Sequence, residues 1–340
     1  MWQRQEDYVD FVNQAWNPGP DGGDLLSIAS SLEGMQSALT EWNRNVFGSV
    51  RKKLKSLRDE IEQERTSTLY RGPTIRERDL MKELAETLAR EEEMEKQRAR
   101  MDWLKSGDRN TGFFQAKAKA RARSNRILAL KNSDGLLVNE QEEIERVAIE
   151  FYQGLFTAQE NLDPGLICQY VPRKVTDDMA ELLTWPFDDE EVERALFQMG
   201  PSKAPGADGF TAGFFQKHWS LVKEKVTAAV LGFLNGGEMP EVINRTILVL
   251  ILKVANPQEI SQFRPISLCN VIYKICSKVL ANRLRLILDD IISEEQSAFV
   301  PGRLITDNVL IAYECIHYLH NKKGKSGACA IKLDMVGEFY

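Results

Sequence analysis

The sequence has little of what marks a secreted, membrane-spanning or metal-cluster protein. Its five cysteines are an odd number, lie far apart and form no Cys-X-X-Cys pair, which disfavours a disulfide framework and a zinc cluster. The N-terminus, MWQRQEDYVD, carries acids where a signal peptide would be basic and then apolar. The longest aliphatic run, residues 247–252, is far too short to span a bilayer. We therefore expect an intracellular protein, in the nucleus or the cytoplasm, with no membrane partner.

The sequence also lacks an overall positive charge. Its formal net charge is −6, so binding to nucleic acid would have to come from a local basic patch. Apolar residues make up 43% and charged residues 28% of the 340 residues, as in ordinary globular proteins. This length is enough for two or three domains.

Residues 1–100 are predicted to be helical. Apolar residues recur there at spacings of three or four, which predicts one stripe of a single long helix: Leu32, Met35, Leu39, Trp42, Val46, Val50, Leu54, Leu57 and Ile61. The turn Arg71-Gly72-Pro73 should break this helix. Leu80, Leu84 and Leu88 then begin a second helix. The two helices predict an antiparallel hairpin, which we interpret as a structural arm or linker.

Residues 101–185 contain the strongest candidate for nucleic-acid contact. The stretch QAKAKARARSNR carries five cations and no acid: Lys117, Lys119, Arg121, Arg123 and Arg126. A strand would put the first four on one face, whereas a helix, which the alanines favour, would separate them. A solvated charged face is the alternative interpretation. A hairpin with its turn at Asp134-Gly135 and an amphipathic helix follow, the helix carrying Ile144, Val147, Phe151 and Leu155.

From about residue 186 the pattern alternates between helix and strand. Asp188 and Asp189 should cap one helix, and Thr211 should open another that runs to Gly236-Gly237. A buried strand, TILVLIL, a proline-bearing loop and a helix over about residues 267–290 are expected next. A helix over about 306–320 and a terminal strand complete the pattern.

Two loops carry basic residues that suit phosphate. In SKAPGADGF, Lys203 precedes a helix start, which favours an anion, although a tight turn explains the same residues. In FRPISL, which follows Lys253, Arg264 is followed by proline and can meet a phosphate with two hydrogen bonds. The alternative for Arg264 is pairing with a local carboxylate.

A third basic loop, two histidines and three acidic pairs complete the candidate residues. QSAFVPGRLITDN places Arg303 at a turn before a helix, where it either meets nucleic-acid backbone or serves helix entry. His317 and His320 are interpreted as surface residues, because no acid or thiol completes a metal set. The pairs in TDD, FDD and LDD lie at expected helix ends and are not interpreted as catalytic carboxylates.

The terminal strand, AIKLDM, presents one aspartate, Asp334. Two-metal phosphoryl or nucleotidyl transfer needs several carboxylates around a pair of cations. Asp334 can be the first of them, and in isolation it can equally cap a turn.

Taken in order, these motifs resemble the reverse transcriptases of LINE-type non-LTR retrotransposons, with plant sequences looking closest. The resemblance covers about residues 186–335: KAPGADGF, the strand with Lys253, FRPISLCNVIYKICSKVLANRL, EQSAFVPGRLITDN and AIKLDM. Upstream, EWNRNVFGSVRKKL and MDWLKSGDRNTGFF look like the segment that joins endonuclease to polymerase in such proteins.

The resemblance implies an α+β fold: a helical arm (1–100), a pre-polymerase segment (101–185) and a partial right-hand polymerase (186–340) with fingers and the first palm strand. It implies synthesis of DNA on an RNA template from a DNA primer. By position, Lys253 and Arg264 would bind the incoming nucleotide, Asp334 would bind catalytic Mg²⁺, and Phe339 would lie against the ribose. Lys203 and Arg303 would join the basic stretch in contacting nucleic acid.

The sequence departs from the family after Met335, where VGEFY replaces the usual Ser-Lys-Ala-Tyr-Asp. The second carboxylate motif, an aromatic-Ala-Asp-Asp turn, would lie beyond residue 340. We therefore expect a polymerase truncated within the palm and inactive alone. The alternative is a non-catalytic, nucleic-acid-binding remnant.

Overall fold

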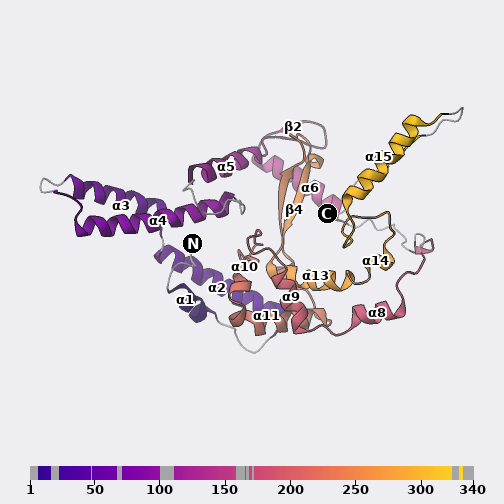
Figure 1. Ribbon diagram of the computed structural model, residues 1–340, viewed down its shortest axis with the longest axis horizontal. Helices are drawn as coiled ribbons and strands as arrows, with labels where there is room; N and C mark the ends of the chain where they lie inside the picture. The colour runs from indigo at the N-terminus through magenta and orange to yellow at the C-terminus, as the bar shows by residue number, and fades with distance from the viewer. Residues whose placement is uncertain are drawn as a thin grey trace.

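Helices dominate the computed structural model, which describes residues 7–16, 23–46, 48–66, 71–99, 111–157, 165, 168–170, 172–323 and 329–331. An N-terminal helical hairpin projects from one end of an elongated molecule, and α15 projects from the other (Figure 1). The helices are α1 (Tyr8–Ala15), α2 (Leu25–Val46), α3 (Val50–Arg65), α4 (Ile75–Ala99), α5 (Thr111–Ser124), α6 (Gln141–Phe156), α8 (Asp177–Thr184), α9 (Asp189–Phe197), α10 (Ala212–Lys217), α11 (Trp219–Leu234), α12 (Glu241–Asn244), α13 (Val271–Leu284), α14 (Leu288–Ile291) and α15 (Ile305–Asn321).

The described strands form two small antiparallel sheets. β1 (Leu130–Lys131) pairs with β2 (Leu137–Val138), and β3 (Ile247–Leu252) pairs with β4 (Phe263–Leu268). The predicted hairpin turn at Gly135 is confirmed, since this glycine has φ +77° and its N–H bonds the Asn132 carbonyl. The α+β class is thus confirmed as a mainly helical fold with few strands.

The single long helix predicted across residues 32–61 is wrong, because the chain breaks between α2 and α3. Gly48 adopts φ +52°, a left-handed conformation that ends a helix. Ser49 then caps α3, its side chain accepting a hydrogen bond from the Lys52 N–H. The apolar spacing continues through the break, so periodicity alone could not reveal it.

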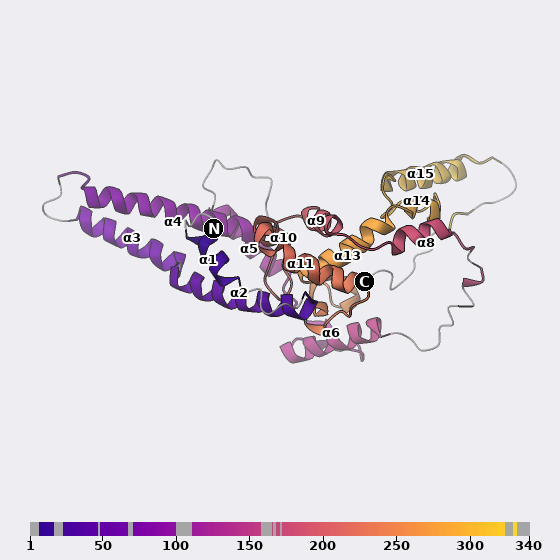
Figure 2. The ribbon, with the colours of Figure 1, turned by 90° about the horizontal axis from the view of Figure 1, so that it is seen from below.

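The predicted antiparallel hairpin of α3 and α4 is confirmed. Leu54, Leu57 and Ile61 are buried on α3. Ion pairs run from both ends of α3 to α4: Arg51 with Glu95, and Arg65 with the buried Glu77 at 2.7 Å. Since Arg51 begins α3 and Glu95 lies near the end of α4, the two helices run in opposite directions, as Figure 2 also shows.

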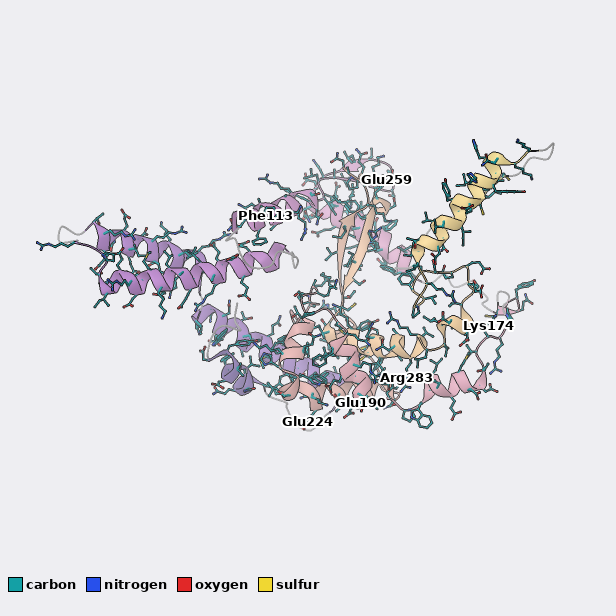
Figure 3. All side chains as sticks on the ribbon, viewed as in Figure 1. Phe113, Lys174, Glu190, Glu224, Glu259 and Arg283 are labelled. Carbon is teal, nitrogen blue, oxygen red and sulfur yellow. The ribbon has the colours of Figure 1, made fainter. Side chains whose placement is uncertain are left out.

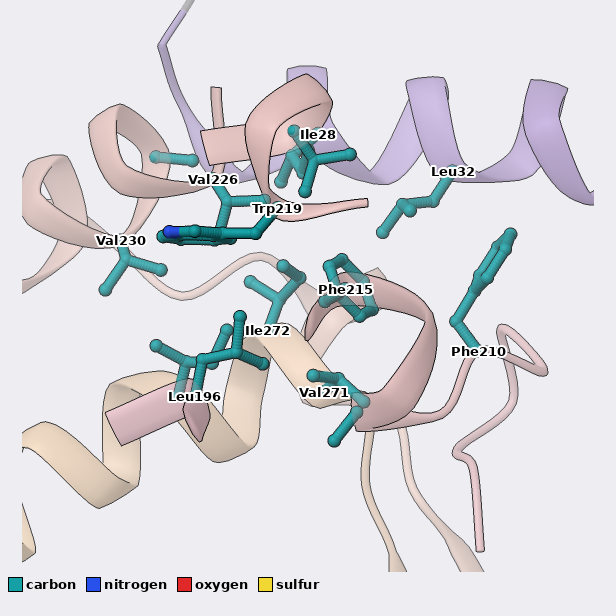
Figure 4. Close-up of a cluster of buried hydrophobic side chains, with 14 of the residues drawn as sticks. Ile28, Leu32, Leu196, Phe210, Phe215, Trp219, Val226, Val230, Val271 and Ile272 are labelled. Carbon is teal, nitrogen blue, oxygen red and sulfur yellow. The ribbon is translucent and has the colours of Figure 1, made fainter. Parts of the chain in front are cut away.

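The main hydrophobic core is built from α1 and α2 together with α9, α10, α11 and α13. Figure 4 shows Ile28 and Leu32 of α2 across from Leu196, Phe215, Trp219 and Ile272. Residues near the N-terminus therefore share one core with residues some two hundred positions later. Tyr8 of α1 adds a polar contact, its hydroxyl lying 3.3 Å from Nε2 of the buried His218.

The helix predicted from Thr211 to residue 235 is two helices. His218, with φ −102° and ψ 24°, ends α10 and starts α11. The turn lets Phe215 and Trp219 both enter the core. Similarly, the helix predicted over 267–290 begins later, at Val271, and ends at Leu284, with α14 a separate short helix.

Arg283 anchors the last turn of α13. Its guanidinium bonds both carboxylate oxygens of Glu191, at 2.6 and 2.7 Å, and the carbonyls of Leu183, Trp185 and Pro186. It also stacks 3.6 Å from the Phe187 ring centroid. Asp188 and Glu191 form the capping box that confirms the predicted start of α9. Arg283 thereby fastens the end of α13 to the α8–α9 connection.

The β3–β4 ribbon corrects two expectations. β3 is partly exposed rather than buried, with Ile247 and Leu248 open to solvent. FRPISL, expected within a loop, is strand β4 and pairs along its whole length, from Leu252 opposite Phe263 to Ile247 opposite Leu268. One ribbon face packs on a second small core, which is formed by Leu130, Ile144, Tyr152, Ile260 and Phe263.

That second core also sets which side of α6 is buried. The amphipathic helix predicted there is confirmed, but its buried residues are Ile144 and Tyr152, while Phe151 and Leu155 are exposed. The helix predicted over 306–320 is confirmed as α15, whose large apolar side chains are exposed. No helix in the described ranges is long and apolar enough to cross a membrane.

Candidate nucleic-acid interface

The loop that carries Lys203 is held on the β4–α13 junction. Asn270, buried at the start of α13, accepts a hydrogen bond from the Asp208 N–H at 3.4 Å. Its amide nitrogen donates to the carbonyls of Val242 and Ile243. Lys274, one helical turn later, donates from Nζ to the Ala204 carbonyl at 3.2 Å. Three segments distant in sequence thus meet at the first turn of α13.

Gly206 makes this close docking possible. A Cβ at this position would collide with Oδ1 and the backbone nitrogen of Asn270 and with the carbonyl carbon of Cys269. Backbone approaches backbone here, which only glycine permits. The loop is thereby fixed two residues after β4 ends.

Asp208 is the electrostatically unusual residue of this loop. Its Oδ1 accepts the Phe210 N–H at 3.2 Å, whereas its Oδ2 is buried without a hydrogen-bond partner in the described structure. Burial raises the pKa of the Asp208 carboxyl from 3.8 to about 6, against a smaller opposing effect of the Lys274 charge. A carboxylate that loses solvation in this way destabilises the fold at neutral pH.

Lys203 itself is exposed, and its aliphatic chain covers Gly200. Its backbone N–H bonds the Gly200 carbonyl at 3.2 Å, and Gly209 similarly bonds Gly206. The loop is therefore a succession of tight turns, as the alternative interpretation expected. The Lys203 ammonium has no polar partner among the described residues, so it remains open to an anion.

Arg264 lies on the ribbon face opposite the second core. It is exposed, stands opposite Ile251 and makes no hydrogen bond or ion pair with any residue that the structure describes. Within that part of the chain, the local carboxylate considered as its alternative partner is absent. Lys253 follows β3 and falls on the same side by strand alternation. Its Nζ donates to the Ser261 carbonyl at 3.1 Å.

The basic stretch forms helix α5, which decides between the two conformations weighed above. Phe114 is buried and α5 packs along α4. The five predicted side chains are all exposed: Lys117, Lys119, Arg121, Arg123 and Arg126. Phe113, labelled in Figure 3, is 41% exposed on the same helix. Cations beside an exposed aromatic ring suit a single nucleic-acid strand, whose phosphates and bases they can bind together.

The side chain of Arg303 donates its hydrogen bonds to other residues of the same chain. Its guanidinium bonds the carbonyls of Ile292, Ser293 and Gln296 and reaches Oδ1 of Asp289 at 3.4 Å. Only 18% of its side chain is exposed. These bonds close the loop that follows α14.

Asp334 and Phe339, the predicted metal and ribose contacts, lie outside the described residues. Within the described ranges, no group of three or more His, Cys, Asp or Glu side chains could hold a metal ion. His317 and His320 are exposed on α15, as expected of surface histidines.

Sequence reasoning missed Asn270, Lys274 and Asp208. Asn270 precedes a helix, which signals a cap, yet its side chain makes no capping bond and instead binds the distant loop. No local pattern carries that information.

Residues 252–340, from the end of β3 onward, match the sequence profile of the family described as reverse transcriptase (RNA-dependent DNA polymerase). This class of polymerase acts on nucleic acids and uses divalent metal ions. The match takes in β4, α13 and Arg264.

The chain is also similar to a transposon protein over a longer stretch of sequence. Over 326 residues, 93% of the chain, it is 28% identical to the "Transposon TX1 uncharacterized 149 kDa protein" of Xenopus laevis. The matched segment covers 24% of that protein, so the chain spans about a quarter of the length of this curated relative. Together these findings confirm the predicted resemblance to a non-LTR retrotransposon reverse transcriptase.

Proposed function

We propose that the chain is the fingers-side part of a retrotransposon RNA-directed DNA polymerase, which positions an RNA template, a DNA primer and the incoming nucleotide. One observation supports this most: the KAPGADGF loop and strand β4, two motifs expected to face substrate, are joined through Asn270 and Lys274. The reverse transcriptase match covers β4, Asn270 and Lys274, whereas the KAPGADGF loop precedes the matched residues. The strand with Arg264 and the loop with Lys203 would act as one rigid unit.

In this proposal each basic group has a phosphate to bind. Arg264, exposed and without an internal partner, would hold the triphosphate with two parallel hydrogen bonds, with Lys253 adding charge nearby. Helix α5, Lys203 and Arg303 would follow the backbone of template and primer. Of these, Arg303 would first have to leave the carbonyls that it now binds.

Asp334 would supply the first carboxylate for Mg²⁺, which when bound stabilises the charge of phosphoryl transfer, and Phe339 would lie against the ribose. The acidic pairs elsewhere in residues 1–340 do not supply a second carboxylate. Asp188 caps α9, and Asp289 and Asp290 lie in α14. Residues 1–340 by themselves should therefore bind substrates without joining nucleotides.

A primer-extension assay tests this proposal. Purified residues 1–340, mixed with a primed RNA template, Mg²⁺ and deoxynucleotides, should give no extension above the protein-free reaction. Extension that disappears in Asp334→Ala would show that the chain is catalytically complete.

A longer protein, whose sequence continues into an aromatic-Ala-Asp-Asp motif, should extend the primer. In that protein, Arg264→Ala should raise the KM for nucleotide by roughly tenfold, the value of one charged contact. Arg245→Ala, at an exposed position just before β3, is the matched control.

A non-catalytic nucleic-acid-binding role is the second candidate. It is supported by the exposed cations and exposed Phe113 of α5, which need no catalytic carboxylate. RNA binding that is lost with the α5 cations and unchanged by Asp334→Ala and Arg264→Ala would favour this candidate. The transcript sequence beyond the Tyr340 codon separates the two, because only the polymerase needs a further carboxylate motif.

A further inference from the structure

Helix α3 carries a second cationic surface, distinct from α5. Between Glu41 and Asp59 the sequence has no acidic residue but six cations: Arg44, Arg51, Lys52, Lys53, Lys55 and Arg58. Five of them fall in the first nine residues of α3. The hairpin that carries them projects from the body of the molecule, so this helix is accessible (Figure 1, Figure 2).

Arg44 lies on α2 and pairs with Glu41, and the five cations of α3 divide into two groups by their partners. Arg51 and Lys53 form ion pairs with Glu95 and Glu83 of α4. Lys52, Lys55 and Arg58 are exposed and make no ion pair or hydrogen bond from their side chains with residues that the structure describes. The first group therefore links α3 to α4. The second group makes no such link among the described residues.

The unpaired cations lie on one continuous surface. Lys55 and Arg58 fall on the same side of α3 as the paired Arg51, at spacings of four and three residues. They line a shallow groove of about 230 Å³ between α3 and α4, together with Leu54, Asp59 and Glu91. Lys52 extends the surface outward, away from the buried Leu54, Leu57 and Ile61.

This charge placement does not serve the stability of the helix. The first turn of a helix carries a partial positive charge, which disfavours cations such as Arg51, Lys52 and Lys53 at that end. Acids would suit that end, yet α3 holds its acids in the second half, as Asp59, Glu60, Glu62 and Glu64. A bound anion would remove the repulsion.

We propose that Lys52, Lys55 and Arg58 bind the phosphate backbone of a nucleic-acid duplex. The α3 sequence contains no aromatic residue on which a base could stack, so contact with backbone alone is what the surface offers. That chemistry favours a duplex, whose bases are hidden, over the single strand that suits α5 and Phe113. This proposal goes beyond the polymerase function and does not depend on it.

The experiment measures binding of the full chain to a labelled DNA duplex of 20 base pairs and to a labelled single-stranded RNA, across a salt series. The test variant is Lys52→Ala/Lys55→Ala/Arg58→Ala, which keeps the Arg51–Glu95 pair. The control is Lys174→Ala/Arg285→Ala/Lys322→Ala, three exposed cations outside α3 and α5, which removes the same charge. A second variant, Lys52→Arg/Lys55→Arg/Arg58→Lys, keeps the charge.

The test variant should bind the duplex roughly tenfold or more weakly than the control, and its salt slope should fall by up to about 3, from three lost phosphate contacts at about 0.9 each. The charge-keeping variant should bind like the parent, and RNA binding should follow the control. Duplex binding equal to the control would overturn the proposal. An equal loss for RNA, or weak binding by the charge-keeping variant, would overturn the duplex assignment or the electrostatic cause.

Discussion

At the scale of single residues, the docked loop holds a carboxyl group that burial makes unfavourable. Asp208 has one oxygen bonded to the Phe210 N–H and one buried oxygen without a partner among the described groups. Burial raises the pKa of Asp208 to about 6, whereas the unfolded chain titrates near 3.8. Between these values the folded chain binds the proton more tightly than the unfolded chain does. The stability that protonated Asp208 supplies below pH 3.8 is therefore lost as the pH rises through about 6.

Replacing Asp208 by asparagine should stabilise the protein at pH 7.5. The amide keeps the oxygen that accepts the Phe210 N–H and removes the buried charge, so unfolding free energy should rise by about 1–3 kcal/mol. The gain should shrink as the pH falls from 7 to 4, because wild-type Asp208 then becomes neutral. Urea unfolding at several pH values measures both effects.

Asp134→Asn, in the exposed β1–β2 turn, is the control and should change stability little at any pH. A gain from Asp208→Asn that stays constant with pH would contradict an electrostatic cause. A loss of stability at pH 7.5 would contradict the prediction, because the buried charge would then cost less than the unpaired amide nitrogen that replaces Oδ2.

At the scale of elements, periodicity predicted most helices but not where they are interrupted. The alanines correctly favoured a helix for α5, and the apolar spacing placed α3 and α4. The breaks at Gly48 and His218 were missed because the buried stripe resumes on the next helix, and each interruption depends on local backbone angles. The composition of β3 predicts a buried strand, yet only one face of the β3–β4 ribbon is covered.

Removing four α5 cations should weaken binding of single-stranded RNA. In Lys117→Ala/Lys119→Ala/Arg121→Ala/Arg123→Ala, alanine keeps the helix while up to four phosphate contacts disappear. The salt slope should fall by about 3, from about 0.7 for each contact with a single strand. Fluorescence anisotropy over a salt series measures it.

The matched control removes Lys174, Arg285, Lys322 and Lys323, four exposed cations outside α5. RNA binding that is equal in the two quadruple variants would dismiss α5 as the contact site. Phe113→Ala should weaken binding with an unchanged salt slope, since stacking involves no counterions.

At the scale of the whole molecule, the N-terminal helices belong to the main core. α2 buries six apolar side chains against it: Leu25, Ile28, Leu32, Met35, Leu39 and Trp42. At about 1.5–3 kcal/mol for each, their burial equals or exceeds the usual net stability of a domain. The expected boundaries near residues 100 and 185 stay a prediction, but a unit cut at residue 186 would lose this packing.

A truncated chain of residues 186–340 should therefore lack cooperative unfolding, because α11 would lose its packing against α2. Thermal melting followed by circular dichroism measures this. Removal of residues 305–340 is the control, since the apolar side chains of α15 are exposed and its loss should leave the transition in place. A cooperative melt of residues 186–340 at the parent temperature would refute the shared core.

The sequence by itself determined the family resemblance, most helices, the basic run of α5 and the candidate Arg264, because each of these depends only on residues that are close along the chain. Only the tertiary structure decided that FRPISL is a strand, that Asn270 and Lys274 hold the KAPGADGF loop, that Arg303 is bonded internally and that α2 completes a core with α11. Those features depend on contacts between residues tens to hundreds of positions apart. Local propensity and residue spacing do not encode such contacts, because the contacts form only when the elements pack together.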